Sequence, residues 1–283
     1  GRFYTTGFDR RGSLVNGLGT VQAIAEGENI ACVPQRCWIT TPGKGIWEAL
    51  GRDAGCYSSC AALAIHVAEE WRKGNASAFA PYLRSLPTEA DYRRFHPAYL
   101  QGEAPLNPDF DVWSGEGGLK HHVRRCYARY AESVVDPPGF AEVFRSFVHI
   151  HARRFEGAEL VPLVDKANTA PRRELNAAPV AAWVDGDMRY CMRALRDIGA
   201  GEEVLLDYQS SQASALAFFT TYGFTLGRGE HGAGEGMCRD LGSGDFGHPG
   251  PDADPLLRSV WRFAAEHCHP LEAARPKGRR RTA

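Results

Sequence analysis

Side chains capable of chemistry lie in the second half of the 283-residue chain. Arg153 offers a planar fork of donors that suits a carboxylate, and the neighbouring Arg154 is an alternative for the same role. Asp165 closes an apolar run, and Asn168 follows in Asp-Lys-Ala-Asn-Thr. Tyr208 ends the segment Gly-Glu-Glu-Val-Leu-Leu-Asp-Tyr. Considered alone, this tyrosine caps a core with its ring, and the asparagine satisfies its own backbone in a turn.

The first elements that must position these residues are short strands. Residues 12–42 read as strands broken by Gly and Pro, with 21–24 and 30–33 as candidates. Residues 23–28 between them look like a turn that carries the chain back.

A helical block follows from about residue 45. Leu63, Val67 and Trp71 recur every four residues, which predicts one apolar helix face that stops at Gly74-Asn75. Further helical pieces are expected in 88–133, interrupted by a loop at 102–118, and in 140–155.

Extended pieces then return. The apolar run 160–164 meets Asp165, and 180–184 with 188–194 predict a strand pair around the turn 185–187. The remaining expectations are a buried strand at 204–206, a helix at 214–221, a Gly-rich loop after 227 and a helix at 254–267.

The order of these elements indicates the fold class. Strands, then helices, then strands differ from the regular alternation of a parallel α/β sheet. No G-x-G-x-x-G follows a strong strand, which argues against a Rossmann fold. We therefore expect an α+β fold.

Charge and hydropathy exclude several partners. The net charge is −1, so a global attraction to nucleic acid is not supported. No apolar run reaches the roughly 18 residues that a bilayer span needs, and no signal peptide opens the chain. The basic run RPKGRRR at 275–281 is typical of a solvated tail, with nuclear import or a nucleic-acid contact as the alternative.

The cysteines and histidines do not predict a metal site. Cys56 and Cys60 lie four apart, but a second ligand pair at workable spacing is missing. The histidines at 121, 122, 149 and 151 lack a third-ligand pattern. We expect no metal, and reduced, mostly buried thiols in an intracellular protein. The eight cysteines are Cys32, Cys37, Cys56, Cys60, Cys126, Cys191, Cys238 and Cys268.

Four segments occur in an order that resembles the SET domain. They are GLG with TVQAIAEGENIACVPQRCWIT, LAIHVAEEWRKGNASAFAPYLRSLP, ARRFEGAELVPLVDKANT, and GAGEEVLLDYQSSQASALAFFTTYGF. The resemblance covers about residues 10–226 and is strongest to the subgroup with a helical insertion, the Rubisco lysine methyltransferases and the actin-histidine methyltransferase. The last segment is the most specific.

The resemblance implies an α+β SET-domain fold of small sheets with a pseudoknot and an inserted helical subdomain. The expected divisions are 1–47 for the N-terminal part, 48–150 for the insertion, 151–228 for the C-terminal part, and 229–283 for a flexible loop, short helix and basic tail.

It also implies methyl transfer from S-adenosylmethionine to a protein side chain, most simply lysine. Free lysine has a pKa of about 10.4, and a desolvated aromatic channel lowers it so that the amine has a lone pair. Tyr208 matches the family's catalytic tyrosine. The alternatives are a protein-histidine methyltransferase and a non-catalytic SET-fold binding module.

Eight residues stand at positions of the family's cofactor contacts. Gly17 and Gly19 are expected in a turn that lets the backbone approach the cofactor. The family pattern at Asn168 is Asn-His, and Thr169 replaces the histidine here. The others are Arg153, Asp165, Tyr222 and Phe224. Asn176 matches a downstream asparagine only weakly. The substrate expected is a lysine in a peptide segment, with no membrane partner; cytoplasm, nucleus and plastid are not distinguished.

Overall fold

The computed structural model describes residues 3–10, 13–40, 44–58, 60–93, 96–99, 118–155, 159–184, 186–209, 212 and 215–226. The chain divides into two compact units. The first comprises Gly1–Pro87 and Trp113–Tyr208, and the second comprises Thr88–Val112 and Gln209–Ala283.

The first unit contains two antiparallel sheets. β1 (Phe3–Arg10) pairs with β2 (Ser13–Thr20). The second sheet has the order β3-β5-β4, formed by β3 (Asn29–Pro34), β4 (Ala177–Val184) and β5 (Asp187–Ala194). The expected strand at 30–33 and the expected hairpin are confirmed, and Gly186 takes φ +77° in its turn.

One apolar core joins the two ends of the first unit. Its residues come from the first 38 positions and from 161–206, so segments far apart in sequence bury each other's apolar surface. The core comprises Leu18, Ile24, Ile30, Val33, Trp38, Val161, Val164, Ala167, Ala177, Tyr190, Met192, Ala194, Ile198, Val204 and Leu206.

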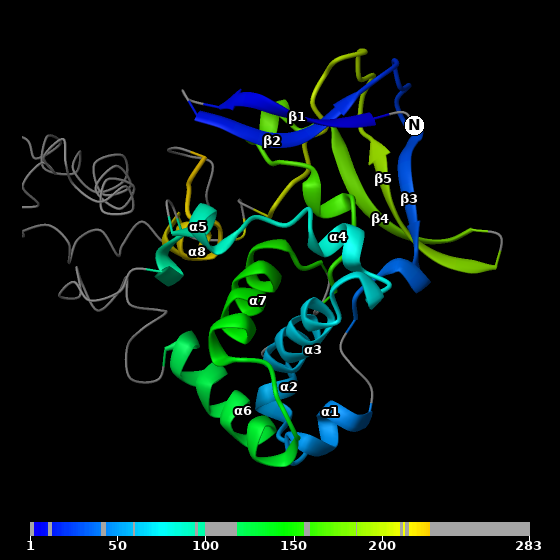
Figure 1. The fold of residues 1–283 in the computed structure, drawn as a ribbon. Coiled ribbons are helices and arrows are strands. Elements are labelled where there is room, and N and C mark those ends of the chain that lie inside the picture. The colour runs from blue at the N-terminus through cyan, green and yellow to red at the C-terminus, as the bar shows by residue number, and fades with distance from the viewer. Residues whose placement is uncertain are drawn as a thin grey trace, which may run out of the picture. The chain divides into compact units, whose positions relative to one another are not determined.

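The helices of the first unit fall between residues 44 and 153 and gather beside the strands (Figure 1). They are α1 (Lys44–Ala49), α2 (Ala54–Ser58), α3 (Ala61–Arg72), α4 (Ala80–Leu83), α6 (Leu119–Ser133) and α7 (Phe140–Arg153). Short 3-10 helices lie at Gln35–Cys37, Gly74–Ala76, Val164–Lys166 and Arg172–Glu174. Among the described residues, no helix is both long and apolar enough to cross a bilayer.

The two central helices, α3 and α7, follow the expected pattern. Leu63 and Val67 are fully buried in α3, and Phe147 and Val148 are buried in α7. The helix α7 begins at a cap in which Glu142 accepts from the Gly139 N–H at 2.7 Å.

Four expectations about the elements need correction. Gly17 and Gly19 lie inside β2, opposite Thr6 and Tyr4, rather than in a turn. Gly19 also forms a bridge with Glu203, so backbones approach β2 on both sides and favour residues without a side chain. Residues 21–24 are not a strand, because only Ile24 forms a bridge there. Residues 160–164 turn into the 3-10 helix Val164–Lys166. Residues 204–206 form isolated bridges, from Leu205 to Asn168 and from Leu206 to Ala177, instead of a strand, because each pairs with a different segment.

Several expectations lie outside the described residues. They are the loop at 102–117, the Gly-rich segment after 227, the helix at 254–267 and the basic run at 275–281.

The second unit holds a buried histidine between its two segments. It contains α5 (Glu89–Tyr92), the 3-10 helix Pro97–Tyr99 and α8 (Ala215–Tyr222), which confirms the helix expected at 214–221. The Nδ1 atom of His96 accepts from the Ala98 N–H at 3.2 Å, and Nε2 lies 2.9 Å from the Thr221 carbonyl oxygen. This pattern assigns the proton to Nε2.

Burial makes His96 resist protonation in the folded state. Burial lowers the pKa of His96 from 6.5 to about 4, against the raising effect of the Thr221 carbonyl. The unfolded chain takes up the proton first as the pH falls. The stability that neutral His96 contributes is therefore present above about pH 6.5 and is lost as the pH falls towards 4.

We predict that His96→Gln flattens the pH dependence of the free energy of unfolding in this window. Glutamine keeps an amide for the Thr221 carbonyl but does not titrate. Urea unfolding at a series of pH values measures the slope, with His121→Gln at an exposed ring as the control. An unchanged slope in His96→Gln would contradict the role of burial.

Candidate functional site

Arg153, at the end of α7, is fixed to Asp165. Its Nη1 donates to the Asp165 carbonyl oxygen at 2.9 Å and lies 3.4 Å from Oδ2 of the same residue. Tyr82 of α4 donates its hydroxyl to that Oδ2 at 2.9 Å. Arg154 instead donates to Cys60 Sγ at 2.8 Å. Of the two alternatives open in the sequence, Arg153 is therefore the one that faces the Asp165 segment.

Asn168 ties three parts of the chain together. Its Nδ2 donates to the Asn16 carbonyl oxygen at 3.1 Å and to Glu203 Oε1 at 2.7 Å. Its own carbonyl oxygen accepts from the Leu206 N–H at 2.8 Å. The side chain is therefore not satisfied within its own turn. It links the residue before Gly17 to the segment that leads to Tyr208.

The hydroxyl of Tyr208 points at the same segment. It donates to the Ala167 carbonyl oxygen at 2.8 Å, and its ring packs against the core of the first unit while remaining partly exposed. A tyrosine that only caps the core would explain the packing of the ring. The hydrogen bond of the hydroxyl also fixes Tyr208 to the backbone of Ala167.

Two buried oxygens in this segment lack a hydrogen-bond partner among the described residues. They are Asp165 Oδ1 and Thr169 Oγ1. Buried polar atoms are costly unless they are hydrogen-bonded, so each is a candidate contact for a ligand. Lys166 lies between them in sequence. Burial lowers its pKa to about 8, with the Asp165 carboxylate opposing that effect, and its Nζ donates to the Ser85 carbonyl oxygen at 2.9 Å.

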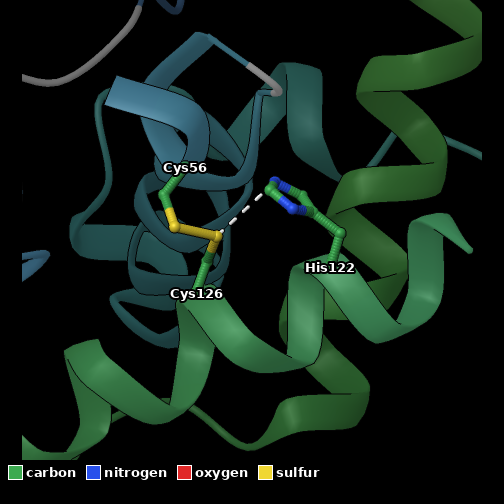
Figure 2. Close-up of side chains that lie close together, drawn as sticks. All are labelled: Cys56, His122 and Cys126. Carbon is green, nitrogen blue, oxygen red and sulfur yellow. Dashed lines mark hydrogen bonds between the residues drawn. A yellow bond between two sulfur atoms is a disulfide. The ribbon is translucent and has the colours of Figure 1, made fainter. Parts of the chain in front are cut away.

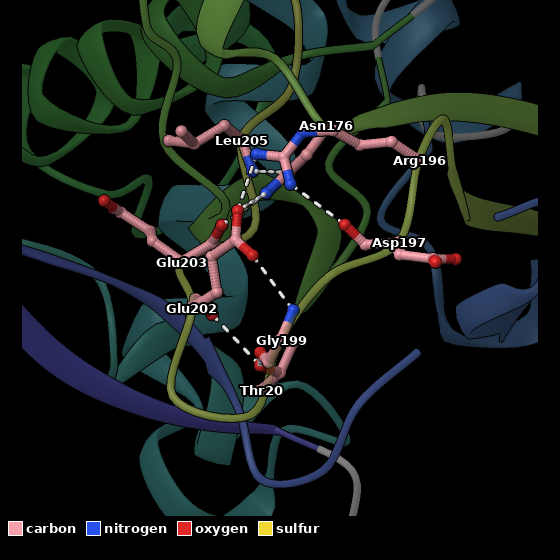
Figure 3. A network of polar contacts seen from close by, with 8 residues as sticks. All are labelled: Thr20, Asn176, Arg196, Asp197, Gly199, Glu202, Glu203 and Leu205. Atoms are coloured by element: carbon pink, nitrogen blue, oxygen red, sulfur yellow. Dashed lines mark hydrogen bonds and ion pairs between the residues drawn. The ribbon is translucent and has the colours of Figure 1, made fainter. Parts of the chain in front are cut away.

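A buried asparagine, Asn176, holds the extended segment 203–205 that precedes Tyr208 (Figure 3). Its Oδ1 accepts from the Leu205 N–H at 2.7 Å, and its Nδ2 donates to the Glu203 carbonyl oxygen at 2.7 Å. Its backbone N–H lies 3.3 Å from the Leu205 carbonyl oxygen. Asn176 is fully buried, so these bonds form away from water.

Glu202 completes this network. It accepts from Arg196 Nη2 at 2.6 Å, from the Gly199 N–H at 2.9 Å and from Asn176 Nδ2 at 3.3 Å. Burial raises the pKa of Glu202, but these three hydrogen bonds outweigh burial and hold the pKa below its ordinary value. The carboxylate therefore stays ionised and fixes the turn before that segment.

Sequence reasoning missed most of this support. It gave no role to Tyr82 or Glu203 and only a weak match to Asn176. The available signal was a polar Asn directly before the apolar strand of 177–184, a position where a buried amide needs partners.

Most of the expected site residues belong to one unit of the structure. Gly17, Gly19, Arg153, Asp165, Asn168, Thr169 and Tyr208 all lie in the first unit. Tyr222 and Phe224 lie in the second unit, where both rings pack against Phe218 with centroids 4.6 and 5.5 Å away. Their expected place beside the cofactor stays a prediction.

We predict that Asn176→Ala lowers the free energy of unfolding by about 1–3 kcal/mol, because the buried Leu205 N–H loses its partner. Urea denaturation measures the change. The matched control is Asn75→Ala, at an exposed asparagine that bonds Arg84, which should change stability by less than about 0.5 kcal/mol. Equal effects of the two substitutions would contradict the structural role of Asn176.

Comparison with known proteins gives a result at the level of fold. No protein-family model matches the sequence, and no curated protein matches it. Among solved structures, the SET domain of LSMT bound to lysine and AdoHcy is similar, with a TM-score of 0.54 and 17% identity over 79% of this chain. The same domain bound to methyllysine and AdoHcy gives a TM-score of 0.56 and 16% identity over 79% of this chain.

Rubisco LSMT bound to sinefungin and monomethyllysine gives a TM-score of 0.55 and 16% identity over 79% of this chain. The matches cover 52–53% of those chains, so this chain spans about half their length. The small antiparallel sheets, the helical block and the order of the segments agree with these neighbours. The chain therefore has the SET-domain fold.

Proposed function

We propose that the chain is a methyltransferase that uses S-adenosylmethionine and acts on lysine side chains of proteins. The observation that carries the proposal is the bond of the Tyr208 hydroxyl to the Ala167 carbonyl at 2.8 Å. It joins the expected catalytic tyrosine to the Asp165–Thr169 segment, on a fold whose solved neighbours are bound to lysine and AdoHcy.

The residues present fit a ligand with the polar groups of S-adenosylmethionine. Asp165 Oδ1 and Thr169 Oγ1 are buried without a partner among the described residues, so an amino or hydroxyl group has acceptors there. The Arg153 guanidinium, held at Asp165, suits a carboxylate. The residues that would hold the cofactor are Gly17, Gly19, Arg153, Asp165, Asn168 and Thr169. The cofactor, when bound, supplies a methyl group on a sulfonium sulfur.

The residues of the chain would prepare the amine rather than react with it. The Tyr208 hydroxyl donates its hydrogen bond to the Ala167 carbonyl, so the hydroxyl oxygen of Tyr208 is available to accept from an amine N–H. The aromatic ring tolerates positive charge at the approach to that oxygen. Withdrawal of a lysine from water lowers its pKa, and orientation of the neutral amine removes an entropic barrier.

The helical block between residues 44 and 153 would shape the approach of the protein substrate. It contacts the site through Arg153 of α7 and Tyr82 of α4, which both bond Asp165. A change in the packing of these helices would therefore reach the cofactor segment directly.

A non-catalytic SET-fold binding module is the second candidate. The feature that favours it is Thr169, which stands where the family pattern has a histidine. Binding and turnover must therefore be measured separately.

We predict that Tyr208→Phe lowers methyl transfer by about a hundredfold or more and leaves cofactor affinity unchanged. Phenylalanine keeps the ring but removes the oxygen that orients the amine, and misplacement of a reacting group costs on the order of a hundredfold. The control is Tyr127→Phe, because the Tyr127 ring packs on Phe140 in the helical block, with centroids 5.6 Å apart.

The assay uses methyl-labelled S-adenosylmethionine and a protein extract as acceptor, followed by hydrolysis and amino-acid analysis. Label in methyllysine supports the proposal, whereas label in methylhistidine supports the histidine enzyme. A wild-type protein that binds the cofactor but transfers no label supports the binding module. A full rate in Tyr208→Phe would contradict the role of Tyr208.

A further inference from the structure

Three side chains with metal-binding chemistry meet in the helical block, and none of them belongs to the proposed transferase site (Figure 2). Cys56 comes from α2, and His122 and Cys126 come from α6. One ligand atom from each lies within 4.8 Å of the other two. The two sulfurs are joined as a disulfide, and His122 Nε2 lies 3.6 Å from Cys126 Sγ.

The sequence argued against a zinc site because Cys56 and Cys60 lacked a second ligand pair. The fold supplies that pair from elsewhere. His122 and Cys126 are four apart and share one face of α6, which brings both to Cys56. Cys60 is not part of the group, because its sulfur accepts from Arg154.

We propose that Cys56, His122 and Cys126 bind one Zn²⁺ when the cysteines are reduced, with a water molecule as the fourth ligand. Zinc takes such a set of thiolate and imidazole ligands in tetrahedral sites. The proposal is independent of the proposed methyltransferase function.

The position of the histidine supports this site. With Zn–S of about 2.3 Å and Zn–N of about 2.0 Å, a tetrahedron places the sulfur and nitrogen about 3.5 Å apart. The separation between Cys126 Sγ and His122 Nε2 is 3.6 Å. The two sulfurs would lie about 3.8 Å apart on the metal, which requires that the bond between them be broken first.

The surroundings of His122 also suit a ligand. The backbone of Gly55, one residue before Cys56, forms a hydrogen bond with the imidazole. In the disulfide form, Arg125 Nη2 lies 3.2 Å from Nδ1, and Nε2 is the ring nitrogen that faces Cys126 Sγ.

A neighbouring ion pair already aligns the two helices. Asp53 Oδ1 accepts from the N–H groups of Gly55 and Cys56 at 2.9 and 3.3 Å. Its Oδ2 accepts from Arg129 of α6 at 2.6 Å. Cys126 and Arg129 thus face the same short helix, so the ligands from α2 and α6 stay near each other when the disulfide opens.

The chemical steps balance with an external thiol reductant. The reductant gives two electrons and two protons to the Cys56–Cys126 disulfide, which becomes two thiols, and is itself oxidised to a disulfide. Zn²⁺ then displaces the two thiol protons and takes the neutral imidazole as its third ligand. Both states therefore connect α2 to α6, across 70 positions of sequence.

The buried residues of α6 are Val123, Cys126 and Tyr130. A metal or disulfide at Cys126 therefore adds a link from the buried face of α6 to α2, beside the contact of Arg129 with Asp53.

The test is titration of the reduced full chain with Co²⁺ alone, without oxygen, followed by displacement with Zn²⁺. We expect one equivalent of Co²⁺ with a thiolate-to-cobalt absorption band, which Zn²⁺ removes. His122→Ala should weaken Co²⁺ affinity on the order of tenfold or more, since loss of even an outer-shell partner costs that much. Cys126→Ser should remove most of the thiolate band.

Two matched controls keep the test decisive. His121→Ala removes the neighbouring exposed histidine and should leave the affinity unchanged. Cys32→Ser with Cys191→Ser removes the other disulfide, between β3 and β5, and should leave the band unchanged. Equal affinities for His122→Ala and His121→Ala would overturn the proposal. A Cys56–Cys126 disulfide that persists under a thiol reductant, shown by mass spectrometry of alkylated peptides, would also overturn it.

Discussion

The structure of the site depends on one backbone segment, 202–206, that is hydrogen-bonded on two sides. Val204 N–H donates to the Leu18 carbonyl oxygen at 2.8 Å, and Leu206 N–H donates to the Asn168 carbonyl oxygen at 2.8 Å. Buried backbone groups must be paired, so this segment has one stable position between β2 and the residues around 168. Tyr208 follows two residues later, so the position of this segment also fixes the position of Tyr208. The side chains of Asn168 and Asn176 fill the remaining polar contacts.

The helices contact the neighbouring segment 165–169 through the buried carboxylate of Asp165. The Asp165 side chain is fully buried, and it contacts both Tyr82 and Arg153. A buried carboxylate is tolerated when it is hydrogen-bonded and paired with a cation, so the helical block and the Asp165–Thr169 segment stabilise each other. The cysteine and histidine group on α2 and α6 belongs to the same block but shares no residue with this contact. Zinc or disulfide chemistry there would act on helix packing rather than on the transferred group.

The sequence predicted those elements in which apolar residues or turn residues recur at a regular spacing within a short stretch. The four-residue spacing from Leu63 gave α3, and the alternation around Gly186 gave the β4–β5 hairpin. It failed where the answer depends on distant partners. Gly17 and Gly19 were expected in a turn because the sequence around them does not show that β2 pairs with other segments on both sides. The expectation of reduced thiols was wrong for four cysteines in this structure, because Cys32 faces Cys191 only after the strands pair, and Cys56 meets Cys126 only after the helices pack. Cys37 and Cys60 are free thiols.

Calorimetric titration with S-adenosylhomocysteine tests the central claim most directly, with Arg153→Ala and Arg154→Ala as a matched pair. Arg153 bonds the Asp165 segment, whereas Arg154 bonds Cys60. The account predicts a one-to-one isotherm in the micromolar range for the wild type, on the order of tenfold weaker binding for Arg153→Ala, and unchanged binding for Arg154→Ala. No heat of binding from folded wild-type protein, or equal losses in the two variants, would contradict the account.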